Sequence, residues 1–191
     1  MNALSGLVLA GGKSTRMGRD KALIKYDGLP LIEHQIRKLA EAGCKPIFIS
    51  GRGYEKFGQT VEDLIPDCGP MGGIYSGLKK VDSDRCLVLA VDLPHVRASF
   101  LQLLIEKSSG VDVAYPVSTH GAEPLCAVYR KECCLPVMEK FIQNKELSLQ
   151  NLIQTILKKG KGLGIKKSEW KKFGSDLFSN LNSPEDLKGI L

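Results

Sequence analysis

The sequence predicts an α/β fold in which helices cover both faces of a mostly parallel sheet, a three-layer doubly wound arrangement. Two observations carry this prediction. Short apolar runs bounded by glycine, proline or acidic residues recur along the chain, and segments with helical periodicity lie between them. The runs are nearly continuous in apolar residues, which is typical of parallel strands that are buried on both faces.

The expected strands are residues 6–10, 46–50, 86–90 and 111–115. The first three begin about 40 residues apart, which leaves room for a crossover helix after each strand. The helix after the first strand has Pro30 at its first position, apolar residues at helical spacing from Ile32 to Ala40, and Gly43 at its end. The other expected helices are residues 70–81, 99–107, 131–144 and 148–157.

Composition excludes several classes of protein. The 191 residues are 43% hydrophobic and 25% charged, which is ordinary for a globular protein and unlike a disordered or collagen-like chain. The longest apolar run, residues 86–91, is far shorter than the roughly 20 residues that cross a bilayer. No basic segment precedes the first apolar run, so we expect a cytoplasmic protein without a secretion signal. The six cysteines include no C-x-x-C pair and are expected to be reduced and mostly buried.

The positive charge of the chain is concentrated in one segment. The formal net charge is +6, and residues 158–172 alone carry seven lysines against one glutamate, Glu169. This segment is interpreted either as a solvated face or as a basic surface for an anionic substrate or partner. With one tryptophan and no aromatic residues interleaved with the lysines, the segment does not favour nucleic-acid binding.

A glycine-rich basic loop follows the first strand. Residues 11–21 contain three glycines and the cations Lys13, Arg16, Arg19 and Lys21. Glycines allow backbone N–H groups to converge on anionic oxygens, and the basic side chains surround that point with positive charge. The loop is therefore a candidate phosphate cradle.

Two familiar phosphate loops do not match this segment. A Walker A loop ending at Gly12-Lys13-Ser14 would need its first glycine at Leu7. A dinucleotide fingerprint starting at Gly11 would need glycine where Lys13 stands. Neither a P-loop nucleoside triphosphatase nor a classical dinucleotide-dependent dehydrogenase is expected.

Acidic residues follow the later strands. Asp92 comes directly after the apolar run 86–91, and an unpaired carboxylate there is costly to bury. A hard cation such as Mg²⁺, shared with substrate phosphates, stabilises such a group, so Asp92 is the candidate metal ligand. Asp63 and Asp67 lie in a loop that leads into the helix at 70–81, and either can accept hydrogen bonds from a base or sugar. Together these features suit a nucleoside triphosphate.

The motifs resemble those of the molybdenum cofactor guanylyltransferase family. The first motif is Leu9-Ala10-Gly11-Gly12-Lys13-Ser14-x-Arg16-Met17-Gly18-x-Asp20-Lys21, in which Asp20-Lys21 is the variant typical of that family. Further matching segments are spread over nearly the whole chain, at residues 29–34, 62–63, 69–73, 92–94, 124–129 and 180–187. The resemblance implies a Rossmann-related, GT-A-like fold of the kind found in nucleotide-diphospho-sugar transferases. It also implies one nucleotidyltransferase domain over residues 1–191, with a nucleotide-binding part over roughly 1–110 and an acceptor-binding part over roughly 111–191.

The resemblance assigns roles to individual residues. It places the GTP phosphates on the loop that begins with Leu9, Ala10, Gly11 and Gly12 and on Lys21. It prefers Asp63 over Asp67 for nucleotide contacts, and it implies that Asp92 binds both GTP and Mg²⁺. Lys21, Asp92 and Arg16 are thereby the implied catalytic residues, with Arg16 neutralising charge on the triphosphate.

The reaction implied by the family is the transfer of GMP from GTP to the terminal phosphate of Mo-molybdopterin, with release of pyrophosphate. The implied partners are GTP, Mo-molybdopterin, and molybdoenzymes, their chaperones or other proteins of cofactor biosynthesis. No nucleic acid or membrane is expected as a partner. Two residues depart from the family pattern: Ser50 stands where some relatives carry an asparagine that touches the nucleotide, and Glu123 stands where relatives often have histidine or glutamine.

Two other functions remain open at this stage. One is the same chemistry with other substrates, such as CTP with the same cofactor or a small sugar phosphate. The other is a nucleotide-binding protein without turnover, although the joint presence of Lys21, Asp63 and Asp92 favours an enzyme.

Overall fold

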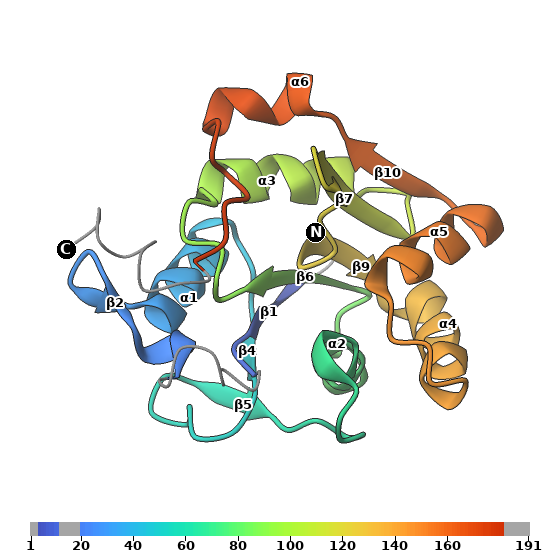
Figure 1. The fold of residues 1–191 in the computed structure, drawn as a ribbon, viewed down its shortest axis with the longest axis horizontal. Helices are drawn as coiled ribbons and strands as arrows, with labels where there is room; N and C mark the ends of the chain where they lie inside the picture. The colour runs from blue at the N-terminus through green and yellow to red at the C-terminus, as the bar shows by residue number, and fades with distance from the viewer. Residues whose placement is uncertain (1–3, 12–19, 182–191) are drawn as a thin grey trace.

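The computed structural model describes residues 4–11 and 20–181 (Figure 1). Gly12 and Arg16 therefore lie outside the described residues, as does most of the matching segment at 180–187. The strands are β1 Leu4–Leu9, β2 Lys25–Tyr26, β3 Leu29–Pro30, β4 Ile47–Ser50, β5 Gln59–Val61, β6 Arg85–Ala90, β7 Val113–Ser118, β8 Gly121–Ala122, β9 Cys126–Arg130 and β10 Gly162–Ile165. The helices are α1 Leu31–Glu41, α2 Gly69–Lys80, α3 Ala98–Lys107, α4 Lys131–Gln143, α5 Leu149–Lys159 and α6 Lys167–Trp170, with 3-10 turns η1 Lys21–Leu23 and η2 Lys171–Phe173.

One sheet of eight strands organises the molecule. Its order is β10-β7-β9-β6-β1-β4-β5, with the short β8 beside β7. β1 pairs in parallel with β4 and β6, β4 with β5, and β10 with β7, whereas β9 runs antiparallel to both of its neighbours. The expected mostly parallel sheet is confirmed, with one antiparallel strand in its interior.

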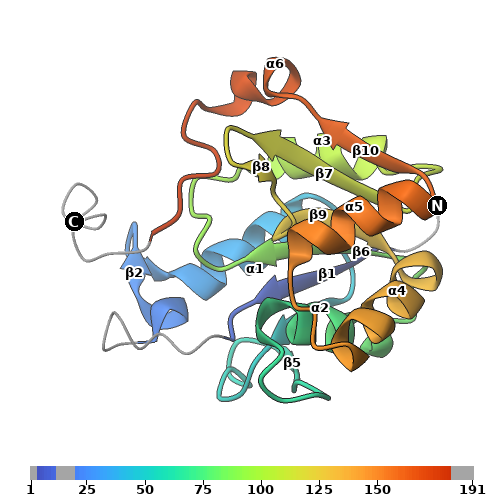
Figure 2. The same cartoon turned by 45° about the vertical axis from the view of Figure 1, so that its right-hand side comes forward.

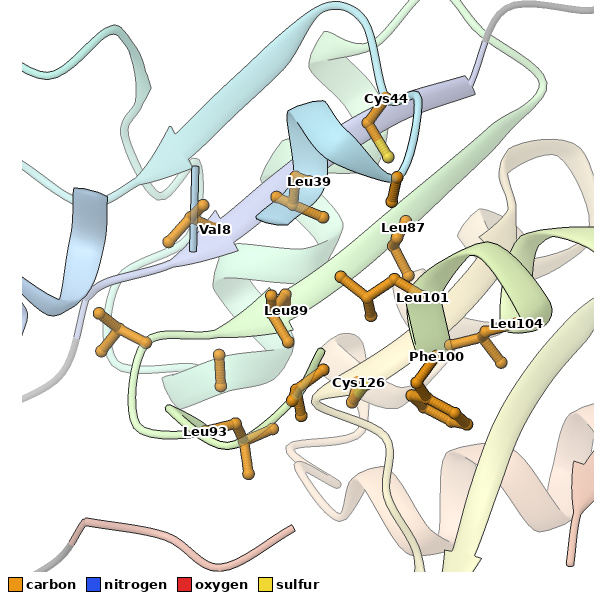
Figure 3. Close-up of a cluster of buried hydrophobic side chains, with 14 of the residues drawn as sticks. Val8, Leu39, Cys44, Leu87, Leu89, Leu93, Phe100, Leu101, Leu104 and Cys126 are labelled. Atoms are coloured by element: carbon orange, nitrogen blue, oxygen red, sulfur yellow. The ribbon is translucent and has the colours of Figure 1, made fainter. Parts of the chain in front are cut away.

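The core lies in two layers, one on each face of the sheet. Side chains alternate along β1, so that Val8 joins one cluster and Leu7 joins the other. The first cluster lies under α1 and α3, and the second lies under α2, α4 and α5, an arrangement that can be followed in both ribbon views (Figures 1 and 2). Figure 3 shows the first cluster, where Leu87 and Leu89 of β6 lie beside Leu101 of α3. The three-layer prediction is therefore confirmed.

Several elements differ from the sequence-based expectations. β5 and β10 were not expected, because β5 is only three residues long and β10 is a glycine-containing strand within the lysine-rich segment. Pro30 precedes α1 and also pairs within the β2-β3 hairpin, so it is not the first helical residue. On α1 the buried positions include Leu31 and Gln35, whereas Ala40 is exposed. The lysines of residues 158–172 are exposed, and the segment forms the end of α5, β10, α6 and part of η2.

Two further sequence-based points can be compared with the structure. All six cysteines are free thiols and five of them are buried, as expected for reduced core residues. Within residues 4–11 and 20–181, no helix combines the length and the apolar character needed to cross a bilayer.

Candidate functional site

The site lies where the winding of the sheet reverses. From β1 the chain crosses through α1 to β4 on one side, and it later crosses through α2 to β6 on the other side of β1. Because α1 and α2 cover opposite faces, the reversal lies at the carboxyl ends of the central strands, which is where ligands bind in such sheets. The register aligns these ends closely, since Leu9 of β1 lies opposite both Ser50 of β4 and Ala90 of β6.

Backbone hydrogen bonds hold the start of the glycine-rich segment against the end of β4. Leu9 and Ala10 are buried at the end of β1, and Gly11 is exposed. The carbonyl oxygen of Ser50 accepts hydrogen bonds from the N–H groups of Ala10 and Gly11, at 3.2 and 2.9 Å. These contacts fix where the candidate phosphate loop begins, although Gly12 itself lies beyond the described residues.

Lys21 and Asp92 come together at this edge, as the sequence predicted for one site. The Lys21 Nζ lies 3.4 Å from Asp92 Oδ2, and the two side chains are 17% and 23% exposed. Lys21 begins η1, and Asp92 lies in the turn directly after β6. The pair joins a cation and a carboxylate from segments 71 positions apart. Both charged groups are therefore partly accessible to a ligand at this edge of the sheet.

The turn that carries Asp92 is held from beneath by α1. The fully buried Gln35 donates from Nε2 to the carbonyl oxygens of Val91 and Leu93, at 3.3 and 3.1 Å. Gln35 Oε1 is buried without a partner among the described residues, so this amide orientation is the one that satisfies two carbonyl acceptors. One turn further along α1, Lys38 donates to the carbonyl oxygen of Pro94.

Burial dominates the electrostatics of Lys38. The apolar surroundings lower the pKa of its ammonium group from 10.5 to about 8, and the nearby Cys126 and Glu41 only partly oppose this shift.

The last described residue also reaches the site, because the Leu181 N–H donates to the carbonyl oxygen of Asp92 at 3.1 Å. The backbone around Asp92 is therefore tied both to α1 and to the carboxyl-terminal segment.

The start of α2 packs against the ends of β1 and β4. A Cβ atom at Gly73 would lie 2.6 Å from Ser50 Oγ and 3.1 Å from Leu9 Cδ2, so glycine allows the helix to approach the ends of β1 and β4. Asp63, in the loop before α2, accepts a hydrogen bond from Ser50. Partial burial raises the pKa of the Asp63 carboxyl, and the Ser50 hydrogen bond and the charge of Arg52 oppose that shift. Asp67 has a φ of +59°, which suits a turn residue.

The geometry at Asp92 fits a magnesium ion that is coordinated by one carboxylate together with substrate phosphates. Proteins usually bind Mg²⁺ through one or two carboxylates and complete its shell with substrate phosphates and water. Asp92 provides one partly exposed carboxylate. Among residues 4–11 and 20–181, no three His, Cys, Asp or Glu side chains gather into a cation site. The residues therefore fit a cation shared between Asp92 and a bound polyphosphate.

The structure adds residues that sequence reasoning missed. Gln35 and Lys38 support the Asp92 turn, and Tyr54, in the loop after β4, contacts Asp20 beside Lys21. One signal for Gln35 was available, since a polar residue occupies a position on the apolar face of α1. Glu123 is half-buried before β9, and burial raises the pKa of its carboxyl against the effects of Ser118 and His120.

Comparisons with known proteins identify the family to which the chain belongs. A family model described as MobA-like NTP transferase domain matches residues 6–160. A probable molybdenum cofactor guanylyltransferase of Clostridium perfringens is 36% identical over 157 residues, which cover 81% of this chain and 77% of the relative. The corresponding protein of Trichormus variabilis is 34% identical over 200 residues, which cover 100% of this chain and 91% of the relative.

Solved structures show the same architecture. A crystal structure of molybdopterin-guanine dinucleotide biosynthesis protein A from Archaeoglobus fulgidus superposes with a TM-score of 0.77 at 25% identity, covering 97% of this chain and 96% of the other. A nucleotidyl transferase from Methanothermobacter reaches a TM-score of 0.79 at 17% identity, with coverage of 100% and 96%, and this likeness concerns the fold. The sheet is that of the nucleotide-diphospho-sugar transferases. On the family match and the relatives together, the chain belongs to the MobA-like NTP transferase family and is a nucleotidyltransferase.

Proposed function

We propose that the chain transfers GMP from GTP to Mo-molybdopterin. An oxygen of the acceptor's terminal phosphate attacks the α-phosphorus of GTP, the bond from that phosphorus to the bridging oxygen of the β-phosphate breaks, and pyrophosphate leaves. The product is the guanine dinucleotide form of the cofactor. The observation that carries this proposal is the pairing of Lys21 with Asp92 beside the glycine-rich segment, in a chain whose relatives are named molybdenum cofactor guanylyltransferases.

The first task of the site is to hold the triphosphate. In this proposal the segment that starts at Leu9, Ala10 and Gly11, and continues with Gly12, holds the phosphates. Because the N–H groups of Ala10 and Gly11 already donate to the Ser50 carbonyl oxygen, the N–H groups that bind phosphate oxygens are those that follow them. The ammonium group of Lys21 lies at the described end of that segment and neutralises phosphate charge. Arg16 adds a second cation in the proposal.

The second task is to neutralise the charge that develops as pyrophosphate leaves. Asp92 holds Mg²⁺ together with the phosphates, and the bound cation neutralises negative charge on the triphosphate. Lys21 and Arg16 contribute positive charge to the same end of the nucleotide. Phosphoryl-type transfer needs little covalent help from a protein, so orientation and charge neutralisation account for most of the rate increase.

Asp63 completes the nucleotide site in this proposal. Its carboxylate lies near the start of α2 and accepts a hydrogen bond from Ser50 at the end of β4, and in this proposal it also accepts hydrogen bonds from the base or sugar. The Ser50 hydrogen bond orients the carboxylate, which supports Asp63 over Asp67. Residues from roughly 1 to 110 then form the nucleotide-binding part, and residues from roughly 111 to 191 form the acceptor-binding part. The lysine-rich residues 158–172 are the surface proposed to meet molybdoenzymes, their chaperones or other proteins of cofactor biosynthesis.

Nucleotide binding tests the proposal. We would measure the binding of GTP, CTP, ATP and UTP by calorimetry, each with and without Mg²⁺, to the wild-type chain and to Asp92→Ala. The matched control is Asp84→Ala, which removes an aspartate near the opposite end of β6 that pairs with Arg130. We expect a preference for GTP with Mg²⁺ that Asp92→Ala loses and Asp84→Ala keeps. A preference for CTP would keep the chemistry and change the product, and no nucleotide binding would refute the proposal.

A further inference from the structure

Tyr54 joins the two described ends of the glycine-rich segment. Its hydroxyl oxygen lies 3.0 and 2.9 Å from the two carboxylate oxygens of Asp20, and 3.3 Å from the carbonyl oxygen of Ala10. The single hydroxyl proton is donated to the Asp20 carboxylate, which is the stronger acceptor. One side chain therefore lies beside both Ala10, just before the segment, and Asp20, the residue before Lys21 at its end.

The ring of Tyr54 is held firmly in place. It is 6% exposed and belongs to the core cluster under α1 and α3. Gly51, with a φ of +128°, allows the ring to come close, because a Cβ atom there would lie 2.8 Å from Tyr54 Cε2. Burial raises the pKa of the Tyr54 hydroxyl, and Asp20 raises it further, so the group remains a proton donor at neutral pH.

Asp20 passes this restraint on to Lys21. Asp20 Oδ1 accepts the N–H of Ala22 at 3.0 Å and thereby caps η1, the turn that begins with Lys21. The carbonyl oxygen of Asp20 also accepts the N–H of Leu23 at 3.1 Å. A continuous set of contacts thus runs from the core through the Tyr54 hydroxyl, Asp20 and η1 to the Lys21 ammonium facing Asp92.

We infer that Tyr54 is a positioning residue for triphosphate binding, which acts through Asp20 to place Lys21. The inference rests on the proposed function, since it presumes that Lys21 binds phosphates. Tyr54 does not touch the nucleotide in this account. Its hydroxyl holds the Asp20 carboxylate, and Asp20 caps the turn that begins with Lys21, so that the Lys21 ammonium is held in place to meet the phosphates.

The test is Tyr54→Phe, which removes the hydroxyl and keeps the buried ring. The matched control is Tyr75→Phe, because the Tyr75 ring is also 6% exposed and its hydroxyl also donates to a carboxylate, Glu139, between α2 and α4. Calorimetry gives the affinity for GTP with Mg²⁺ and for inorganic tripolyphosphate. We expect Tyr54→Phe to weaken both by about ten- to a hundredfold, as for a lost hydrogen bond to a charged group, and Tyr75→Phe to leave both unchanged.

A double-mutant cycle separates positioning from a merely structural role. In a Lys21→Ala background, Tyr54→Phe should change tripolyphosphate affinity by less than about twofold, because the group that it positions is gone. Equal losses in both backgrounds would overturn the inference, as would unchanged affinity in Tyr54→Phe alone. If the chain binds tripolyphosphate in a manner that depends on Tyr54 but does not bind GTP, the proposed nucleotide is refuted and the inference is supported. A wild-type chain that binds neither probe would overturn both.

Discussion

Lys38 provides a direct test of how the Asp92 turn is supported. Its ammonium group is buried between α1 and the segment after β6, donates to the carbonyl oxygen of Pro94, and has a pKa lowered from 10.5 to about 8. Below pH 8 the lysine is charged in both the folded and the unfolded chain, so the full cost of burying the charge is present. Between pH 8 and 10.5 the unfolded chain binds more protons than the folded one, and the free energy of unfolding contributed by this residue rises with pH.

The size of the effect follows from the two pKa values. Proton linkage at Lys38 raises the free energy of unfolding by about 2 kcal/mol between pH 7 and pH 9.5. The cysteines act in the opposite direction, since burial raises the thiol pKa of Cys44, Cys86 and Cys126 and these groups lower stability when the unfolded chain ionises. A pH profile of the wild-type chain alone therefore mixes the two effects. The difference from Lys38→Met isolates the lysine, because the cysteines are common to both proteins.

Urea unfolding of both proteins from pH 7 to pH 9.5, with a reductant present, measures this difference. The wild-type chain should gain about 2 kcal/mol relative to Lys38→Met over that range. Lys140→Met, which changes an exposed lysine on α4, is the control and should differ from wild type by the same amount at every pH. A Lys38→Met difference that stays constant or moves the other way with pH would refute the burial of a charged lysine beneath the Asp92 turn.

Three further predictions concern the site. Asp92→Ala should abolish Mg²⁺-dependent turnover while thermal unfolding still reports a folded chain, and full activity in this variant would remove Asp92 as the metal ligand. Lys21→Ala should lower triphosphate affinity and kcat together, measured by calorimetry and steady-state kinetics, with the exposed Lys25→Ala as an unaffected control. Gln35→Met should lower the free energy of unfolding in urea by about 1–3 kcal/mol, because the buried carbonyl of Val91 loses its donor. An unchanged urea midpoint would show that Gln35 does not support the turn.

The predicted parts of the fold are those with a strong local signal. The central strands β1 and β6 are mostly apolar because helices cover both of their faces, and that burial is visible in the sequence. β10 has the opposite character, since its pairing with β7 depends on a partner almost 50 positions earlier and its glycines and flanking lysines carry no strand signal. Only the folded sheet brings such a segment into register.

The site shows the same division. Lys21 and Asp92 were predicted because each follows a recognisable chain feature, a glycine-rich loop or a buried strand. Gln35 and Tyr54 were not predicted, because their roles depend on contacts with residues that are distant in the sequence. The partners of Gln35 are 56 and 58 positions away, and the partner of Tyr54 is 34 positions away. A side chain that positions another residue leaves little local trace, except where a polar group such as Gln35 interrupts an apolar helix face.

The central claim is that this site moves GMP from GTP to the terminal phosphate of Mo-molybdopterin. The direct measurement is a transfer assay with GTP labelled at the α-phosphate, Mo-molybdopterin and Mg²⁺, in which the label and the released pyrophosphate are both followed. The account predicts that label enters the dinucleotide cofactor in equal amount to pyrophosphate, and that CTP does not replace GTP. Label recovered only as free GMP, or transferred only from CTP, would contradict it.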